Sequence, residues 1–457
     1  MKRFLRKLEW TVVFTLKAIL CISLFVTFYG IYATENWQML NLSRTSVIVT
    51  LTYVCVGILL LMIYGNYDIG KRKSKPIIYS VGLATVITDI IAYITLCIMN
   101  TNVANNISFE FEHPQLLLLI IFIQMILITA FAYGGNAIYF WMYQPEKSCI
   151  ITSSKENVKA LYNAIGKFKK QFRVAYIDDY KSTAVYEHIM HSDTVFIHDV
   201  PASERSEIIE FCYKNFKNIY FTPEIADVVQ LNAKHMVLDD ISLVAAPVKE
   251  LTFEQRFLKR LTDIVISVIA IIVTSPIWLV CGIAIKAYDG GPVFFKQNRV
   301  TKNGKVFNVY KFRTMKDNND NHSVTADDDR ITPIGKKLRK YRIDELPQFI
   351  NILKGEMSVV GPRPEMIENV YNYTNELPEF EYRLRVKAGL TGYAQVAGKY
   401  STSPKDKLIL DLMYIENYSY WKDWKYILLT LVVFFKKDST EAFHDTKDID
   451  WENINKL

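Results

Sequence analysis

The residues best suited to chemistry in this chain are the adjacent carboxylates Asp344 and Glu345, which lie between Arg342 and Pro347. This setting predicts that both acids sit at a helix boundary, close to basic side chains. One carboxylate can attack a phosphoryl group to give an acyl phosphate, and a second can hold a divalent cation against phosphate oxygens. The pair therefore suggests phosphoryl transfer, although an isolated Asp-Glu pair is usually a solvated helix face.

Basic and turn residues form four clusters in the same third of the chain. Phosphoryl transfer depends mainly on positioning and electrostatics, so several Arg and Lys side chains are expected beside the acids. Arginine in particular matches phosphate oxygens in pairs. Each cluster is weak evidence alone, and their occurrence together favours a phosphate site. The clusters are Lys311-Phe312-Arg313-Thr314-Met315, then Arg339, Lys340 and Arg342, then Gly361-Pro362-Arg363-Pro364-Glu365, and Gly389-Leu390-Thr391-Gly392.

An interrupted apolar segment from Ile264 to Ile285 precedes most of these residues. Pro276 lies at its centre, where a proline removes a backbone donor and kinks a helix, and Ser275 can satisfy a freed carbonyl. Basic residues on both flanks favour the cytoplasmic side for both ends. We therefore expect a re-entrant helix that leaves the last third of the chain in the cytoplasm, with an ordinary kinked span as the alternative. The flanking basic residues are Lys259, Arg260, Lys286, Lys296 and Arg299.

Four more apolar runs occupy the first third of the chain. Each is long enough to cross a hydrocarbon core, which takes about 20 helical residues. Lys and Arg concentrate before the first run and between the second and third, so the positive-inside rule places both ends of this four-helix unit in the cytoplasm. Asp89 is the one acid within these runs, and the sequence leaves its role open. The runs are Trp10 to Ala33, Ser46 to Tyr64, Ile77 to Met99 and Leu116 to Met142.

Between residues 147 and 250 the composition becomes that of a soluble domain. Short apolar segments alternate with helical ones, which predicts a parallel α/β sheet. A dinucleotide site would carry a glycine-rich turn after the first strand, but the chain has Thr152-Ser153-Ser154 there. We therefore predict a Rossmann-like domain with a structural or assembly role. Strands are expected at 148–152, 172–177, 194–198 and 218–222, and helices at 156–172 and 204–216.

Composition limits the remaining alternatives. The net charge of +7 suits anionic headgroups or phosphate substrates and is too small and scattered to suggest nucleic acid. The six cysteines form no CxxC pattern, so neither a disulfide framework nor a zinc site is expected. Near the C-terminus, aromatic residues around Trp421 and Trp424 favour a helix on the membrane surface, and a core helix of the catalytic domain is the alternative.

The motifs together resemble the bacterial polyisoprenyl-phosphate hexose-1-phosphate transferases, the monotopic phosphoglycosyl transferases that initiate capsule and exopolysaccharide synthesis. The resemblance is close from Lys259 to about Phe443, and the four helices with the α/β domain resemble the large members of that family. It rests on KRLTDIVISV, GGPVFFKQNRV, KFRTM, ITPIGKKLRKYRIDELPQFINILKGEMSVVGPRP and RLRVKAGLTGYAQVAGKY.

This resemblance implies a multi-pass enzyme of a bacterial inner membrane, with its catalytic domain on the cytoplasmic face. It would transfer hexose-1-phosphate from a UDP-sugar to undecaprenyl phosphate and release UMP. Asp344 would carry the covalent phosphosugar, and Glu345 would help to bind Mg²⁺. The motifs do not determine the sugar, for which we favour glucose over galactose, and they raise a homodimer and membrane-lipid contacts as further expectations. The residues that match phosphate-binding positions are Lys311, Arg313, Arg339, Arg342 and Arg363, and Ser275-Pro276 match the re-entrant break.

The predicted architecture has three parts. Residues 1–146 form four transmembrane helices, residues 147–250 a Rossmann-like domain, and residues 251–457 a mixed, mainly helical catalytic domain with a re-entrant membrane helix. A catalytically silent scaffold for polysaccharide assembly is the alternative function, but it would be expected to lack the acid pair and basic motifs, which are intact. A transporter is disfavoured because the sequence shows no internal repeat.

Overall fold

The computed structural model describes residues 2–64, 68–101, 108–154, 158–247, 250–316, 330–398 and 403–433. These residues fall into two compact units that divide between Thr222 and Pro223. The side chains of residues 2–7, the predicted helix start at Glu156 and the tail after residue 433 lie outside the described part. We consider each unit by itself.

The apolar runs of the first unit fold into helices that each extend a predicted run by a few residues. These helices are α1 (Lys2–Glu35), α3 (Arg44–Tyr64), α4 (Ser74–Asn100) and α5 (Pro114–Met142), with the short α2 (Trp37–Leu40) after the first. Five helices of the described chain are long and apolar enough to cross a membrane, namely these four long ones and one in the second unit. Asp89 is fully buried among them, with Gln124 Nε2 at 3.3 Å from its Oδ1. This acid therefore faces the interior of the helix bundle.

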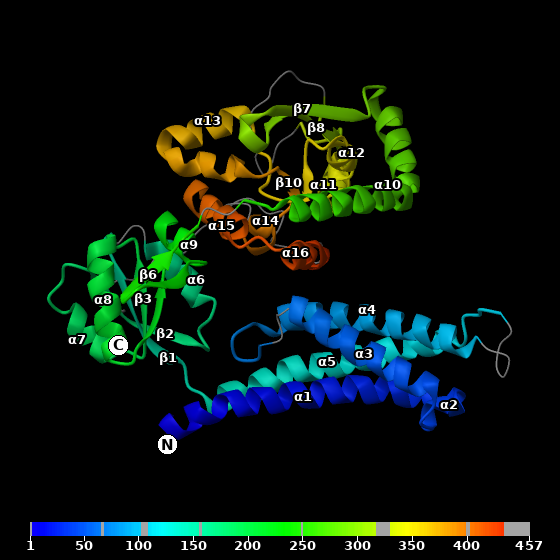
Figure 1. The fold of residues 1–457 in the computed structure, drawn as a ribbon, viewed down its shortest axis with the longest axis horizontal. Coiled ribbons are helices and arrows are strands. Elements are labelled where there is room, and N and C mark those ends of the chain that lie inside the picture. The colour runs from blue at the N-terminus through cyan, green and yellow to red at the C-terminus, as the bar shows by residue number, and fades with distance from the viewer. Residues whose placement is uncertain are drawn as a thin grey trace. The chain divides into compact units, whose positions relative to one another are not determined.

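The α/β part of the first unit alternates strands and helices as predicted. Its elements are β1 (Glu146–Thr152), α6 (Val158–Gly166), β2 (Phe172–Asp179), α7 (Val185–Met190), β3 (Thr194–His198), α8 (Ala202–Lys214) and β4 (Asn218–Phe221). The strands form one parallel sheet in the order β2-β1-β3-β4. Side chains of β1 alternate between the faces, so Cys149 and Ile151 pack with α7 and α8 while Ile150 packs with α6 (Figure 1). The prediction of a helix up to Phe172 was wrong, because the chain turns after Gly166 to enter β2.

The second unit mixes many helices with small two-stranded sheets, as predicted for the last part of the chain. Its helices are α9 (Ile225–Gln230), α10 (Phe253–Asp289), α11 (Pro333–Lys340), α12 (Gln348–Lys354), α13 (Ile367–Glu376), α14 (Tyr393–Ala397), α15 (Pro404–Glu416) and α16 (Tyr420–Val433). The 3-10 turns are η1 (Lys302–Gly304), η2 (Ile343–Glu345) and η3 (Pro378–Arg385). The strands are β5 (Lys234–Leu238), β6 (Ile241–Ala245), β7 (Phe294–Val300), β8 (Val306–Phe312), β9 (Ser358–Val360) and β10 (Gly389–Thr391). The boundary expected at residue 250 lies inside this unit, because Val228 of α9 is buried in its core.

That core is built from segments far apart in the sequence. Val309 of β8, Ile352 of α12 and Val360 of β9 pack in one buried cluster with Phe380 and Leu408. Burial of such side chains is the main force that holds loops of distant origin together. α16 adds Tyr426 to the same cluster while Trp421 is 69% exposed, so this helix has both a core face and a solvent-exposed aromatic face.

The long helix α10 extends 37 residues and contains the predicted proline. Pro276 has no N–H for the carbonyl of Ile272, and the Ser275 hydroxyl donates to that carbonyl at 2.8 Å, as the sequence predicted. Figure 1 shows α10 bent into two limbs, and an internal proline is a common cause of a sharp helix kink. Most apolar side chains of the helix are exposed, including Ile272 and Val273 at 66% and 69%.

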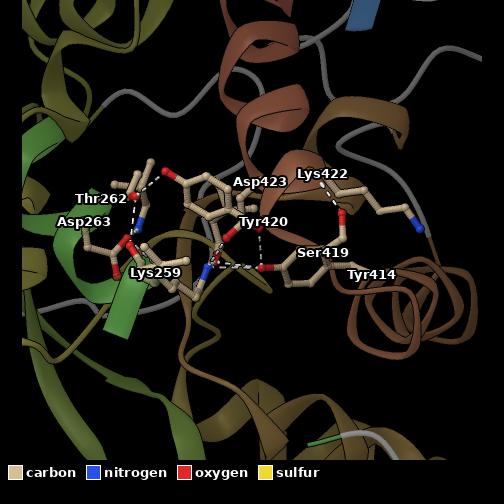
Figure 2. A network of polar contacts seen from close by, with 12 residues as sticks. Lys259, Thr262, Asp263, Tyr414, Ser419, Tyr420, Lys422 and Asp423 are labelled. Carbon is tan, nitrogen blue, oxygen red and sulfur yellow. Dashed lines mark hydrogen bonds and ion pairs between the residues drawn. The ribbon is translucent and has the colours of Figure 1, made fainter. Parts of the chain in front are cut away.

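A polar network attaches the first limb of α10 to the core (Figure 2). Lys259 Nζ donates to Asp423 Oδ2 at 2.6 Å and to the carbonyl of Val360 at 2.9 Å. The Tyr414 hydroxyl donates to the other oxygen of Asp423 at 2.8 Å. One turn further on, Asp263 accepts the backbone N–H of Val359 at 2.8 Å. The network therefore joins α10 to α15, α16 and β9 through buried charges.

We expect Lys259→Met to lower the free energy of unfolding by about 3–5 kcal/mol, because it leaves the Asp423 carboxylate buried without its cation. Arg256→Met is the matched control one turn earlier, where the ion pair with Glu250 is long at 3.8 Å and mostly exposed, so its loss should cost less than about 1 kcal/mol. Thermal unfolding of both variants in detergent measures the difference. Equal melting temperatures would contradict a stabilising role for the network.

Candidate active site

The two carboxylates lie on a short 3-10 turn between two helices. α11 ends at Lys340, η2 carries Asp344 and Glu345, and α12 starts directly after Pro347. Arg342 turns the chain between them with φ of 53°, a left-handed conformation that non-glycine residues seldom adopt. Such backbone strain persists where surrounding contacts enforce it, and it is frequent at functional sites. The predicted helix boundary at the acid pair is therefore confirmed.

Glu345 is a buried anion held by cations. Its Oε1 accepts from Arg363 Nη2 at 2.7 Å and lies 3.7 Å from Lys311 Nζ. Burial alone would raise the pKa of this carboxyl group, but the charges of Arg363 and Lys311 outweigh burial and bring the pKa well below its usual range. The same carboxylate raises the pKa of Arg363. Glu345 is therefore ionised throughout the physiological pH range.

Asp344 has the opposite environment although it is the next residue. Burial raises the pKa of its carboxyl group, and the neighbouring charge of Glu345 raises it further, against the opposing charges of Lys311 and Arg339. The carboxylate is 8% exposed and makes no hydrogen bond to any described residue. Two adjacent carboxyl groups whose pKa values are shifted in opposite directions are typical of active sites in which each group has a different catalytic role. Asp344 is the desolvated member and therefore the candidate nucleophile.

Four of the five predicted basic residues act on the carboxylate pair, and Arg313 does not. Lys311, whose pKa is lowered by burial, and Arg342 both act on the carboxylate pair, together with Arg363. Arg339 Nε donates to the Thr314 hydroxyl at 2.8 Å and also contributes to the charge around Asp344.

Arg313 continues the pairing of β8 with β7. Its N–H bonds to the carbonyl of Val293 at 2.9 Å, directly beyond the pair of Phe294 with Phe312. The side chain is 8% exposed, and its guanidinium pairs with Asp289 at the end of α10. Its contact with phosphate stays a prediction. Gly291 leaves room for this guanidinium, because a Cβ there would overlap it.

Four residues for which the sequence predicted no role of their own hold the loop that carries Arg363, and one of them, Glu365, lies in the loop itself. Arg383 is 2% exposed; its Nη2 donates to the Arg363 carbonyl at 2.8 Å and its Nε to Asp411 at 2.9 Å. Glu365 accepts Lys407 Nζ at 2.9 Å, and the charges of Arg383 and Lys407 overcome the effect of burial and lower the Glu365 pKa to about 2. The presence of Arg383 in RLRVKAGLTG was the available signal. These buried ion pairs therefore fix the position of the loop.

The acid pair suits a hard divalent cation that shares its ligands with a substrate. Among the described residues, no group of three or more His, Cys, Asp or Glu side chains forms a complete protein cage. Mg²⁺ is usually bound by one or two carboxylates while phosphate oxygens and water complete its shell. Glu345 supplies one such carboxylate, beside cations that match phosphate charge. The residues present therefore fit Mg²⁺ bound together with a phosphate substrate.

Comparison with known proteins shows the family of the chain. Residues 254–437 match the model of the bacterial sugar transferase family, and the chain belongs to that family. It is 41% identical over 175 residues to an uncharacterized sugar transferase, EpsL, of Bacillus subtilis, covering 38% of this chain and 85% of that protein. It is 36% identical over 181 residues to a UDP-glucose:undecaprenyl-phosphate glucose-1-phosphate transferase of Caulobacter vibrioides, covering 38% and 68%.

A third relative is named for a different sugar, N-acetylgalactosamine in place of glucose. The chain is 45% identical over 173 residues to a UDP-N-acetylgalactosamine-undecaprenyl-phosphate N-acetylgalactosaminephosphotransferase of Aeromonas hydrophila. That match covers 36% of this chain and 41% of the relative, so the chain spans less than half of the relative's length. The family match, residues 254–437, lies in the second unit, which contains the carboxylate pair.

We expect the two isosteric variants Glu345→Gln and Asp344→Asn to change stability in opposite directions in metal-free buffer at neutral pH. A pKa lowered by folding means that ionised Glu345 stabilises the fold, so its loss should cost about 1–3 kcal/mol. A pKa raised by folding means that ionised Asp344 destabilises the fold, so Asp344→Asn should leave the melting temperature unchanged or raise it. Thermal unfolding with a chelator present measures both. A loss of stability in Asp344→Asn equal to that in Glu345→Gln would contradict the assigned environments.

Proposed function

We propose that the protein transfers hexose-1-phosphate from a UDP-sugar to undecaprenyl phosphate and releases UMP, as the first step of exopolysaccharide or capsule synthesis. The observation that carries this proposal is the contrast at the acid pair: a desolvated, unbonded Asp344 beside a Glu345 held by Arg363 and Lys311. The names of the Caulobacter and Aeromonas relatives support the donor and acceptor classes. UDP-glucose or UDP-galactose is the proposed donor.

The first half-reaction uses Asp344 as nucleophile. An oxygen of its carboxylate attacks the phosphorus that bears the sugar, and the bond from this phosphorus to the bridging oxygen of UMP breaks. UMP leaves with that electron pair, and the sugar phosphate remains on Asp344 as an acyl phosphate. Lys311 and Arg363 lie where they offset the charge on the phosphoryl oxygens. Glu345 would hold Mg²⁺, which would supply positive charge against the phosphate oxygens.

The second half-reaction returns the enzyme to its starting state. A phosphate oxygen of undecaprenyl phosphate attacks the same phosphorus, and the bond to the Asp344 oxygen breaks. The product is a lipid diphosphate sugar, and Asp344 recovers its carboxylate. Burial of Asp344 favours this sequence, because a desolvated anion is a stronger nucleophile and water is kept away from the acyl phosphate.

We also propose that α10 is re-entrant in a bacterial inner membrane, with the second unit on the cytoplasmic face. The bend, Pro276 and the basic residues on both flanks support this path. The exposed apolar side chains of the helix would then contact lipid. A re-entrant path brings the acid pair and a lipid-bound acceptor to the same membrane surface.

Asp344→Asn should reduce UMP release by a factor of about 1,000 or more, because the amide cannot form the acyl phosphate. The assay uses purified full-length protein in nanodiscs with Mg²⁺, undecaprenyl phosphate and a panel of UDP-sugars. Asp240→Asn on the exposed β5–β6 turn is the control and should keep full activity. Turnover retained by Asp344→Asn would remove Asp344 as nucleophile. Folded wild-type protein that releases no UMP from any donor would favour the alternative of a catalytically silent scaffold.

Cysteine labelling tests the topology of α10. Glu254 lies in the first turn of α10 and Lys305 lies beyond its C-terminal end, and both are exposed. Cysteines at these two positions should react only from the cytoplasmic side of sealed inverted and right-side-out vesicles. The native cysteines are first replaced by serine or alanine. Leu42→Cys, in the loop after α2, is the control and should react only from the opposite side. Labelling of Lys305→Cys from the side that labels Leu42→Cys would establish an ordinary span.

A further inference from the structure

Three cations outside the candidate active site converge at the C-terminal end of α12. We name Arg260, Lys302 and Lys387 the cationic cluster. Arg260 Nη1 and Nη2 cap α12 by donating to the carbonyls of Ile352 and Leu353 at 2.6 and 2.7 Å. Asp344 and Glu345 precede the other end of this seven-residue helix, which is roughly 10 Å long at 1.5 Å per residue. The cluster is therefore separate from the carboxylate pair.

Gly355 shows how closely the cations approach. Its φ of +83° suits glycine, and a Cβ at this position would lie 3.6 Å from Arg260 Nη2 and 3.7 Å from Lys387 Nζ. Both distances start from the same point, so the guanidinium and the ammonium are neighbours across a space that no side chain fills. The N–H of Ala388 bonds to the Thr301 hydroxyl at 3.1 Å, which brings the segment containing Lys302 beside Lys387.

The acids around the cluster compensate its charge only in part, because the charge of Asp263 raises the pKa of Lys387 against the larger effects of burial and Arg260. Within the described chain, Lys387 Nζ has no hydrogen bond or ion pair. Asp263 already accepts from Ser358 and Val359, and Glu356 accepts from the Asn351 amide at 2.7 Å. Burial lowers the pKa of Lys387, and the positive charges of Arg260 and Lys302 lower it further. Repulsion of this kind is relieved by a bound anion.

The cluster lies beside an exposed apolar surface. Arg260 is followed within five residues by Leu261, Ile264 and Val265, which are 48%, 38% and 46% exposed on the first limb of α10. Cations next to the end of a lipid-facing helix are placed at the depth of lipid headgroups, where each contributes to binding of anionic lipid. A protein partner would need acidic groups at the same depth, whereas a membrane supplies phosphate there at high concentration.

We propose that the cationic cluster binds the phosphate of an anionic membrane phospholipid. Arg260 offers the N–H groups that its caps leave unused, and Lys387 offers a partly buried ammonium on the other side of Gly355. Lys302, which is exposed, adds charge at the rim. The bound phosphate is not the acceptor of the proposed reaction, because α12 separates the cluster from Asp344. This site does not depend on the reaction that the carboxylate pair performs.

Native mass spectrometry of the full-length protein in detergent tests the site. Phosphatidylglycerol, phosphatidylcholine of the same chain length and inorganic phosphate are each titrated into wild type and into the double variant Lys302→Ala/Lys387→Ala. We expect wild type to prefer phosphatidylglycerol, and the double variant to bind it about 10-fold more weakly. The single variant Lys387→Arg, which keeps the positive charge, should retain most of the wild-type affinity for phosphatidylglycerol. Arg260 is left intact because it also caps α12.

The control is Lys214→Ala/Lys405→Ala, which removes the same charge from exposed positions outside the cluster and should bind phosphatidylglycerol like wild type. An equal loss of phosphatidylglycerol affinity in both double variants would show that only net charge matters, and it would overturn the proposed lipid site. Equal binding of phosphatidylcholine and phosphatidylglycerol by wild type would also overturn it. Displacement of phosphatidylglycerol by inorganic phosphate at equal concentration would identify a soluble phosphate ligand in place of the lipid.

Discussion

A buried carboxylate stays ionised only when a cation stands beside it, and the second unit is arranged around one such pair. Arg363 reaches Glu345 at 2.7 Å, and the Glu345 side chain is 13% exposed while that of Arg363 is 41% exposed. The cost of burying the Glu345 charge is offset only while the two remain in contact. The loop from Gly361 to Glu365 must therefore hold a single position, and the rest of the unit contains the contacts that hold it.

Those contacts reach the loop from three directions. Arg383 bonds to the carbonyl of Arg363 itself, and Arg299 bonds to the carbonyl of Pro364 at 3.2 Å. Lys259 of α10 bonds to the carbonyl of Val360, one residue before the loop. The helix proposed to enter the membrane and the arginine that holds Glu345 are therefore joined through a single backbone segment. A change in the seating of α10 would reach the carboxylate pair through a short chain of packed, hydrogen-bonded groups.

Local patterns made much of this fold predictable from the sequence. Apolar runs identified the long helices, and alternation of strands and helices identified the parallel sheet, because both patterns arise within a few adjacent residues. The contact of Arg383 with Asp411 lies beyond such patterns, since the partners are 28 residues apart and either charge alone resembles a solvated one. Arg313 shows the same limit. Its motif predicts a phosphate contact, but its ion pair with Asp289, 24 residues away in the sequence, lies beyond what the motif can show.

The position of Asp344 explains why these supports are so numerous. A carboxylate that is buried, unbonded and adjacent to another negative charge is destabilising, and a sequence selected for stability alone would not retain it. Glu345 cannot provide relief, because its charge raises the Asp344 pKa further. Stability must come from elsewhere, and the Arg383–Asp411 and Lys407–Glu365 pairs lie in the parts of the unit that hold Arg363. The buried ion pairs thus act mainly by keeping cations close to Asp344 without letting them bond to it. That arrangement would leave the Asp344 carboxylate available for the nucleophilic role that we propose.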